Sequence, residues 1–284
     1  RKRLELLFDD GVYTEINSFT KEKENLAGVI SAYGYVNGNP VYAFSQDKSV
    51  NGGAVGKAHA QKIAKLYSLA AKTGIPVVGI HDSNGAFVDG SADSLTAYSE
   101  MISAASVISG VVPQISAIMG TCAGSAAILA CSADFVVMSE NSEFFVAPPF
   151  DTKKNGVGTA AACAKAGVAH AVCKTDEDTI AKVKEILNLL PSNNLSSAPV
   201  FEFEENNTVC AANDLKSIVD SIADPQTAVE LSADFGTASY TALAAAAGSS
   251  VGIIATNKSD SRLTADDCDK LARFIRMCDA FSLP

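Results

Sequence analysis

The sequence predicts an α/β fold in which parallel strands alternate with helices, and three observations carry this prediction. Short, mostly apolar runs are typical of strands that are buried on both faces of a parallel sheet. Longer segments between them repeat apolar residues every three or four positions, as amphipathic helices do. The two patterns alternate along the chain, which indicates helices layered on a parallel sheet. The apolar runs are residues 77–80, 115–119 and 135–138, and the helical segments are residues 58–73, 94–108 and 126–131.

The N-terminal part predicts a helix and then a hairpin. Residues 3–8 have helical apolar spacing, and an Asp-Asp-Gly sequence ends this helix. Two runs rich in β-forming residues follow, at 27–36 and 41–45. The Asn37-Gly38 pair between them favours a tight two-residue turn, because both residues tolerate positive φ. These two runs are therefore expected to pair as antiparallel strands.

Glycines and acidic residues mark the ends of the predicted helices. A glycine-rich loop at 51–56 precedes the helix at 58–73, and Gly74 closes that helix. Residues 175–190 predict a further helix, because Thr175 and three acidic residues stand at the positive end of its dipole.

Composition excludes several classes of protein. Of 284 residues, 48 % are apolar and 19 % are charged, which excludes a disordered or fibrous chain. The formal net charge of −10 argues against a nucleic-acid or anionic-membrane partner. The apolar runs are too short to span a bilayer. The seven cysteines form no C-x-x-C pair, so we expect no metal site, no disulfides and a reducing, cytoplasmic location.

A repeat suggests how the chain is divided. Residues 62–76 and 270–284 share the pattern Lys, aliphatic, Ala, basic, large apolar, and both end in an aliphatic residue followed by Pro. A strand-like run precedes each copy. The first copy continues into the central strands, whereas the second copy reaches the end of the given sequence at its proline. We therefore predict a first domain, a Ser-rich linker and the beginning of a second domain, at residues 1–192, 193–207 and 208–284.

Two short loops are the candidate sites of chemistry. Gly85-Ala86 and Gly124-Ser125 each follow the carboxyl end of a predicted parallel strand. In open α/β sheets, ligands bind at this edge. Glycine lets the backbone approach a ligand closely, and one amide from each loop can hold a single carbonyl oxygen. Such a pair stabilises an enolate or another oxyanion.

The chain resembles the carboxyltransferase subunits of biotin-dependent acyl-CoA carboxylases and the related acyl-CoA decarboxylases. Acetyl-CoA carboxylase, propionyl-CoA carboxylase and methylmalonyl-CoA decarboxylase belong to this group. The matching segments are residues 3–9, 41–47 with the glycines at 52, 53 and 56, 109–124, 167–170 and 273–281. The resemblance implies a crotonase-like fold, the layered β-β-α superhelix shared with Clp-type peptidases, with the first domain complete and the second partial.

The resemblance also implies the reaction and its site. A carboxyl group passes between carboxybiotin and the α-carbon of an acyl-CoA, in either the carboxylase or the decarboxylase direction, through a thioester enolate. By motif position, the backbone amides that hold the enolate oxygen fall on Gly85, Ala86, Gly124 and Ser125. The residues expected to contact coenzyme A are Gly52, Gly53, Gly56 and Ala123.

The implied partners lie outside this chain. Acyl-CoA is the substrate, and biotin arrives on a biotin carboxyl carrier protein. A biotin carboxylase or a membrane decarboxylase subunit is the further partner. The resemblance places the biotin half of the site in the second domain of a neighbouring subunit. We therefore expect a homo-oligomer or a complex with a complementary carboxyltransferase chain.

Departures from the family pattern leave two other functions open. Ser125 stands where the family commonly has Gly, Phe87 stands where it has Arg, and residues 144–149 replace a Thr-Gly-Pro pattern. One alternative is a non-catalytic acyl-CoA-binding or assembly subunit. The other is a Clp-type serine hydrolase, in which Ser125 is the nucleophile and His81 the base.

Overall fold

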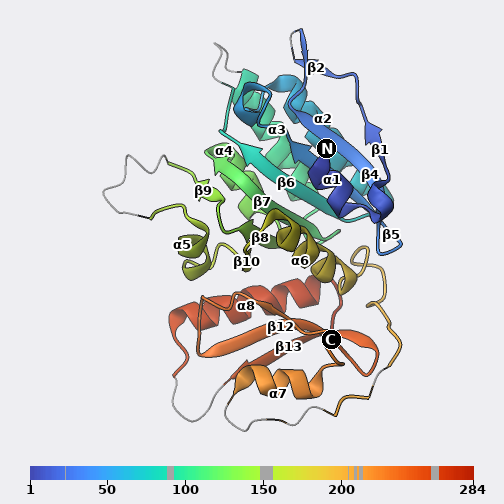
Figure 1. Cartoon of the computed structure of the whole chain (residues 1–284), viewed down its shortest axis with the longest axis vertical. Coiled ribbons are helices and arrows are strands. Elements are labelled where there is room, and N and C mark those ends of the chain that lie inside the picture. Colours follow the sequence, from blue (N-terminus) through green and yellow to red (C-terminus); the bar gives the residue numbers. More distant parts are fainter. Residues whose placement is uncertain are drawn as a thin grey trace.

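The computed structural model describes residues 1–22, 24–87, 93–147, 156–203, 205–207, 210, 214–256 and 262–284. Two β-sheets dominate it (Figure 1). The larger one has eight strands in the order β1-β4-β5-β6-β7-β8-β10, with β9 paired to β7. The smaller one has three strands in the order β11-β12-β13. A two-stranded hairpin, β2–β3, stands apart from both.

The helices are α1 (Lys2–Leu7), α2 (Lys57–Thr73), α3 (Asp93–Val107), α4 (Ser125–Cys131), α5 (Ala160–Lys165), α6 (Asp176–Asn188), α7 (Leu215–Ile222) and α8 (Ala265–Ala280). The short 3-10 turns are η1 (Asp9–Gly11) and η2 (Asn51–Gly53). The strands are β1 (Tyr13–Ile16), β2 (Lys21–Glu22), β3 (Asn25–Leu26), β4 (Val29–Val36), β5 (Asn39–Gln46), β6 (Val77–Ser83), β7 (Gln114–Ala123), β8 (Phe135–Ser139), β9 (Glu143–Phe145), β10 (Ala171–Cys173), β11 (Val229–Leu231), β12 (Ser239–Ala246) and β13 (Ser249–Thr256). Within the described part of the chain, no helix is both long enough and apolar enough to cross a bilayer.

The predicted hairpin and parallel core are confirmed. Strands β4 and β5 pair antiparallel, and Asn37 and Gly38 turn between them with φ of 49° and 75°. From β5 through β6, β7 and β8 to β10, every neighbouring pair is parallel. Gly74 closes helix α2 as predicted, and its backbone is left-handed, with φ of 66° and ψ of 38°. One boundary prediction was wrong: the strand expected to end at residue 119 continues to Ala123, and residues 121–123 pair with β9.

Helices cover both faces of the large sheet. Alternate residues of β8 enter different cores, since side chains along a strand point to opposite faces. Val136 and Met138 pack with helices α2, α3 and α4. Phe135 and Val137 pack with α1, α6 and α8, and with β11 and β12 of the small sheet. Figure 1 shows α6 and α8 between the two sheets. Burial on both faces explains why these strands read as apolar runs.

The C-terminal part repeats the element order of the N-terminal part. Helix, edge strand, hairpin and long helix occur as α1, β1, β4–β5 and α2, and again as α7, β11, β12–β13 and α8. Each edge strand pairs antiparallel with the first hairpin strand. The second hairpin also turns on two residues of positive φ, Ala247 and Gly248. The sequence similarity between the two copies thus coincides with the same local architecture.

Two buried lysines show how closely the copies agree. Lys62 of α2 donates to the carbonyl of Val29, the first residue of β4, over 2.7 Å, and lies 3.7 Å from the Glu15 carboxylate of β1. Lys270 of α8 donates over 2.8 Å to the carbonyl of Ser239, the first residue of β12. Burial lowers the pKa of both lysines, and a carboxylate on the edge strand opposes that shift, Glu15 in one copy and Glu230 in the other.

The closing prolines also match. The carbonyl of Pro76 accepts from the Tyr42 amide of β5, and that of Pro284 accepts from the Gly252 amide of β13. The described residues of 193–207 contain neither a helix nor a strand, apart from one bridge between Val200 and Ser249. The division at residues 1–192, 193–207 and 208–284 stays a prediction.

All three histidines are buried and not protonated at neutral pH. Burial is the main cause that lowers the pKa of His59 and His170 to about 3 and that of His81 to about 4. Each ring is less than one tenth exposed. In the unfolded chain the same groups titrate near 6.5. Protonation therefore favours the unfolded state.

We expect the free energy of unfolding to fall as the pH drops from 6.5 towards 4. The contribution of each histidine is fully present above its unfolded pKa and is lost on acidification, by about 2 kcal/mol per residue at pH 5. Urea denaturation at pH 7, 6 and 5 measures this. The variant His81→Gln should show a smaller loss between pH 7 and pH 5 than the wild type. An equal loss in both proteins would contradict the assignment.

Candidate active site

The two candidate loops lie side by side at the carboxyl edge of the large sheet. Ser83 of β6 pairs with Cys122 of β7, immediately before each loop begins. Beyond that pair, Gly85 approaches so closely that a Cβ atom on it would lie 3.2 Å from the Ala123 carbonyl oxygen. The sequence-based expectation that parallel strands bring these loops together is therefore confirmed.

Only part of the predicted set of backbone donors is free. The Gly85 amide donates to the Ser83 Oγ over 3.1 Å, and the Gly124 amide donates to the Phe145 carbonyl over 2.9 Å. Among the described residues, no acceptor is bonded to the Ala86 or the Ser125 amide. Both residues are partly exposed. One free amide from each loop is the minimum that a two-donor oxyanion site needs.

Gly124 sets the direction of the second loop. Its φ and ψ of 62° and −129° lie in a region that residues with a Cβ rarely adopt. A Cβ built on it would meet no atom within 4 Å, so the space in front of it is open. The glycine is therefore required by backbone conformation and not by crowding. It turns the chain from β7 into α4 and leaves Ser125 as the first helical residue.

A third strand supports this turn. Strand β9 pairs with the end of β7, Phe144 opposite Cys122 and Phe145 opposite Ala123. The Phe145 carbonyl then holds the Gly124 amide. Sequence reasoning read residues 144–149 only as a departure from a family pattern and missed this strand. Residues 148–149 lie outside the described part of the chain, and so does everything from 88 to 92 after Phe87.

Strands β6 and β7 do not stay in register up to the loops. His81 pairs with Ile118 and Ser83 with Cys122, so a step of two residues on β6 matches a step of four on β7. The extra length bulges out of the strand at residues 119–121, which we call the arch. Asp82 is the β6 residue opposite the arch. Ordinary strand-to-strand hydrogen bonds are lost here and must be replaced.

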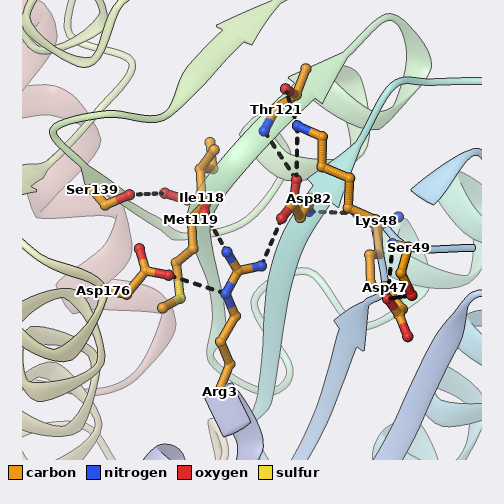
Figure 2. A network of polar contacts seen from close by, with 11 residues as sticks. Arg3, Asp47, Lys48, Ser49, Asp82, Ile118, Met119, Thr121, Ser139 and Asp176 are labelled. Atoms are coloured by element: carbon orange, nitrogen blue, oxygen red, sulfur yellow. Dashed lines mark hydrogen bonds and ion pairs between the residues drawn. The ribbon is translucent and has the colours of Figure 1, made fainter. Parts of the chain in front are cut away.

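Polar side chains replace those bonds (Figure 2). The Asp82 carboxylate accepts from the Thr121 amide over 3.3 Å and from Arg3 Nη1 over 2.9 Å. Arg3 Nη2 donates to the Met119 carbonyl over 2.6 Å. The Lys48 Nζ donates to Thr121 Oγ1 over 3.0 Å and lies 3.6 Å from Asp82. Both ends of the arch are thus held by charged groups from other elements.

Glycine at position 120 makes this network possible. A Cβ on Gly120 would lie 2.1 Å from one carboxylate oxygen of Asp82 and 2.6 Å from the other. The carboxylate therefore fills the volume that a side chain in the middle of the arch would need. Sequence reasoning missed Arg3, Asp82 and Thr121 as contributors to the site. A glycine inside a run otherwise typical of a strand was the one available signal.

The glycine-rich loop packs against the base of the site. A Cβ on Gly53 would lie 2.1 Å from the Asp82 carbonyl oxygen, and one on Gly52 would lie 2.5 Å from Asn84 Nδ2. A Cβ on Gly56 would lie 2.6 Å from the Glu22 carboxylate. These close approaches explain the three glycines by packing.

The Glu22 carboxylate accepts from the amides of Ala58 and His59 over 2.7 and 3.2 Å, so the amino end of α2 already holds an anionic group. Ala123 is buried beside Gly85. Contact of Gly52, Gly53, Gly56 and Ala123 with coenzyme A stays a prediction.

The arrangement does not support a serine nucleophile. His81 Nε2 lies 3.2 Å from Ser116 Oγ, and no described residue is hydrogen-bonded to Nδ1. The ring is 1 % exposed and packs edge-on against Phe44. Ser125 is therefore not hydrogen-bonded to the only base that the sequence offered for it, and burial holds that base away from the open side of the loops.

Comparisons with known proteins identify relatives of this chain. The model of the carboxyl transferase domain matches residues 1–284. The alpha subunit of methylmalonyl-CoA decarboxylase from Veillonella parvula is 37 % identical over 319 residues, covering 100 % of this chain and 63 % of the relative. The propionyl-CoA carboxylase beta chain of Saccharopolyspora erythraea is 33 % identical, covering 100 % of this chain and 60 % of the relative. The chain thus spans less than two thirds of the length of these relatives.

The fold also matches solved structures. The transcarboxylase 12S structure with hydrolysed methylmalonyl-coenzyme A bound superposes with a TM-score of 0.94 at 30 % identity, over 100 % of this chain and 63 % of that one. This likeness confirms the predicted crotonase-like α/β class. With the family model extending over the whole sequence, the chain belongs to the carboxyl transferase domain family.

Proposed function

We propose that this chain provides the acyl-CoA half of a biotin-dependent carboxyltransferase. The observation that carries the proposal is a pair of amides, Ala86 and Ser125, to which no described residue offers an acceptor, on adjacent loops at the carboxyl edge of a parallel sheet. Relatives named for methylmalonyl-CoA and propionyl-CoA support a short acyl chain as the substrate class. A cytoplasmic location is part of the same proposal.

The chemistry needs a donor pair of this kind. When the carboxyl group leaves the α-carbon of a malonyl-type thioester, the electron pair of the breaking C–C bond moves into the thioester and gives an enolate. Negative charge collects on the carbonyl oxygen. Two amides directed at that oxygen bind the enolate more tightly than the neutral thioester, which is what lowers the barrier. In the carboxylation direction the same enolate attacks the transferred carboxyl carbon.

Ser125 takes part through its backbone in this proposal. The family commonly has glycine at this position, and both residues present the same N–H group. Ser125 is the first residue of α4, so its backbone amide has no acceptor within the helix. A serine therefore preserves the donor and adds only a small polar group beside it.

Biotin supplies or accepts the carboxyl group when it is bound, and no residue of this chain is assigned to it. The resemblance places its carbonyl on loops equivalent to those of the first copy of the repeat. Within the described residues 214–256 and 262–284, the second copy reproduces β4, β5 and α2 but not the loops after β6 and β7. The carrier protein, a carboxylase or decarboxylase partner, and an oligomer that joins two half-sites belong to the proposal.

The backbone role of Ser125 can be tested with two substitutions at one position. Ser125→Ala keeps the amide and should retain carboxyl transfer within about threefold. Ser125→Pro removes the amide at the first helical position, where proline is tolerated, and should lower kcat by about 100-fold or more. Steady-state kinetics on the full-length protein with its carrier measure both. Loss of activity in Ser125→Ala, together with labelling of Ser125 by a fluorophosphonate, would favour the hydrolase alternative.

The reaction itself can be tested with methylmalonyl-CoA and propionyl-CoA. We expect the full-length protein to release CO₂ from methylmalonyl-CoA, or to carboxylate propionyl-CoA, only when biotin or a biotinylated carrier is present. The expected reason is that the enolate site alone does not provide the second reactant. Calorimetry with the same thioesters gives the binding control. Tight binding without turnover under any biotin condition would favour the non-catalytic binding subunit.

A further inference from the structure

We propose that Arg3 is a positioning residue, which fixes the distance between the two enolate-binding amides by holding the arch of β7. This inference rests on the proposed function and adds a residue that neither the loop motifs nor the resemblance assigned to the site. Arg3 lies on α1, 79 residues before Asp82 in the chain, and is not bonded to either loop. It acts through Asp82 and the arch.

The position of the arch determines where both amides lie. The hydrogen bond from the Thr121 amide to Asp82 is the last tie between β6 and β7 before the Ser83–Cys122 pair. Ala86 follows Asp82 by four residues, and Ser125 follows Thr121 by four residues. If the arch moves relative to β6, the Ser125 amide therefore shifts relative to the Ala86 amide. The glycines at 85 and 124 cannot absorb the change, because their amides are already tied to Ser83 and Phe145.

Arg3 is hydrogen-bonded to both strands that this contact connects, β6 and β7. Its Nη1 binds the Asp82 carboxylate at 2.9 Å on β6, and its Nη2 binds the Met119 carbonyl at 2.6 Å on β7. Its Nε binds the Asp176 carboxylate at 3.2 Å, at the start of α6. Figure 2 shows one guanidinium facing all three partners. A planar fork can hold three acceptors at once, whereas a lysine ammonium is a single point of charge.

Removing Arg3 leaves buried polar groups without adequate partners. The Asp82 side chain is 9 % exposed, and its other cation, Lys48, is 50 % exposed and lies at 3.6 Å. The Met119 carbonyl is one of the strand acceptors that the bulge separates from β6. A buried carboxylate and a carbonyl that lose a shared donor will move towards water or towards other donors. Met119 and Gly120 of the arch can follow them, because these two residues have no register partner on β6, β8 or β9.

Loss of Arg3 is expected to weaken binding of the transition state more than binding of the substrate. Ground-state binding of the acyl-CoA uses the whole coenzyme A moiety, and the two amides gain strength only when charge develops on the oxygen. Misplacing one amide therefore lowers kcat and leaves KM nearly unchanged. A general loss of stability lowers the amount of folded enzyme, but it does not produce this split.

The experiment compares Arg3→Met, Arg3→Lys and the control Arg1→Met in the full-length protein. Arg1 is a neighbouring cation that pairs with Glu15 on the surface, with its side chain 64 % exposed. We expect Arg3→Met to lower kcat by about 10- to 100-fold with KM for the acyl-CoA within about threefold. Arg3→Lys should be intermediate, and Arg1→Met should match the wild type. Hydrogen exchange of the amides in residues 119–125, measured by mass spectrometry, should accelerate in Arg3→Met and stay unchanged in Arg1→Met.

The outcomes separate this inference from the proposed function. Unchanged exchange in residues 119–125 of Arg3→Met overturns the positioning role, whatever the activity. Faster exchange with wild-type kcat overturns it as well. If the wild-type protein transfers no carboxyl group, the proposed function fails, while the exchange data still decide whether Arg3 holds the arch. If Arg3→Met does not fold, Arg3→Lys and Asp82→Asn carry the same comparison.

Discussion

The geometry of the candidate site depends on one charged contact, between the Arg3 guanidinium and the Asp82 carboxylate at 2.9 Å. Parallel strands normally carry evenly spaced hydrogen bonds, so a register shift between β6 and β7 leaves backbone groups unpaired. The Asp82 carboxylate of β6 and the Arg3 guanidinium of α1 supply partners for backbone groups of β7. Beyond the mismatch, β7 pairs again with β6 at Ser83–Cys122, and this pair places the loop at 124–125 beside the loop at 85–86. The site is therefore a consequence of a defect in strand pairing that charged side chains stabilise.

Packing on the far face of the sheet fixes the position of Arg3. Helix α1 contributes Leu4 and Leu7, both fully buried, to the core that α6 and the small sheet share. Full burial of two leucines contributes about 3–6 kcal/mol in total to holding that helix in place. Phe274 and Met277 of α8 enter the same core. The small sheet and α8 thus pack against helices α1 and α6, which carry Arg3 and Asp176. The predicted linker is not their only connection to the rest of the chain.

The repeated architecture has a physical explanation in its buried lysines. A lysine in the long helix of each copy donates to the first carbonyl of the hairpin, 2.7 Å away in one and 2.8 Å in the other. An ammonium group costs a large desolvation energy unless a carbonyl and a carboxylate receive it. The Glu15 carboxylate lies 3.7 Å from Lys62, and the negative charge of Glu230 opposes the lowering of the Lys270 pKa. The helix is thereby locked to one end of the hairpin in both copies.

The sequence by itself determined most of the elements and the sheet edge at which the candidate loops lie. Apolar runs revealed β6, β7 and β8, the Asn37-Gly38 pair revealed the hairpin, and glycines after two strands indicated neighbouring loops. These features are local, because periodicity and turn preference depend on residues within one segment. Only the tertiary structure showed which loop amides are already bonded, because Gly85 donates to Ser83 and Gly124 donates to a strand that the sequence did not reveal. It alone brought Arg3, Asp82 and Met119 together, because a bulge and the ion pair that fills it are contacts between distant segments and leave no periodic trace in any one of them.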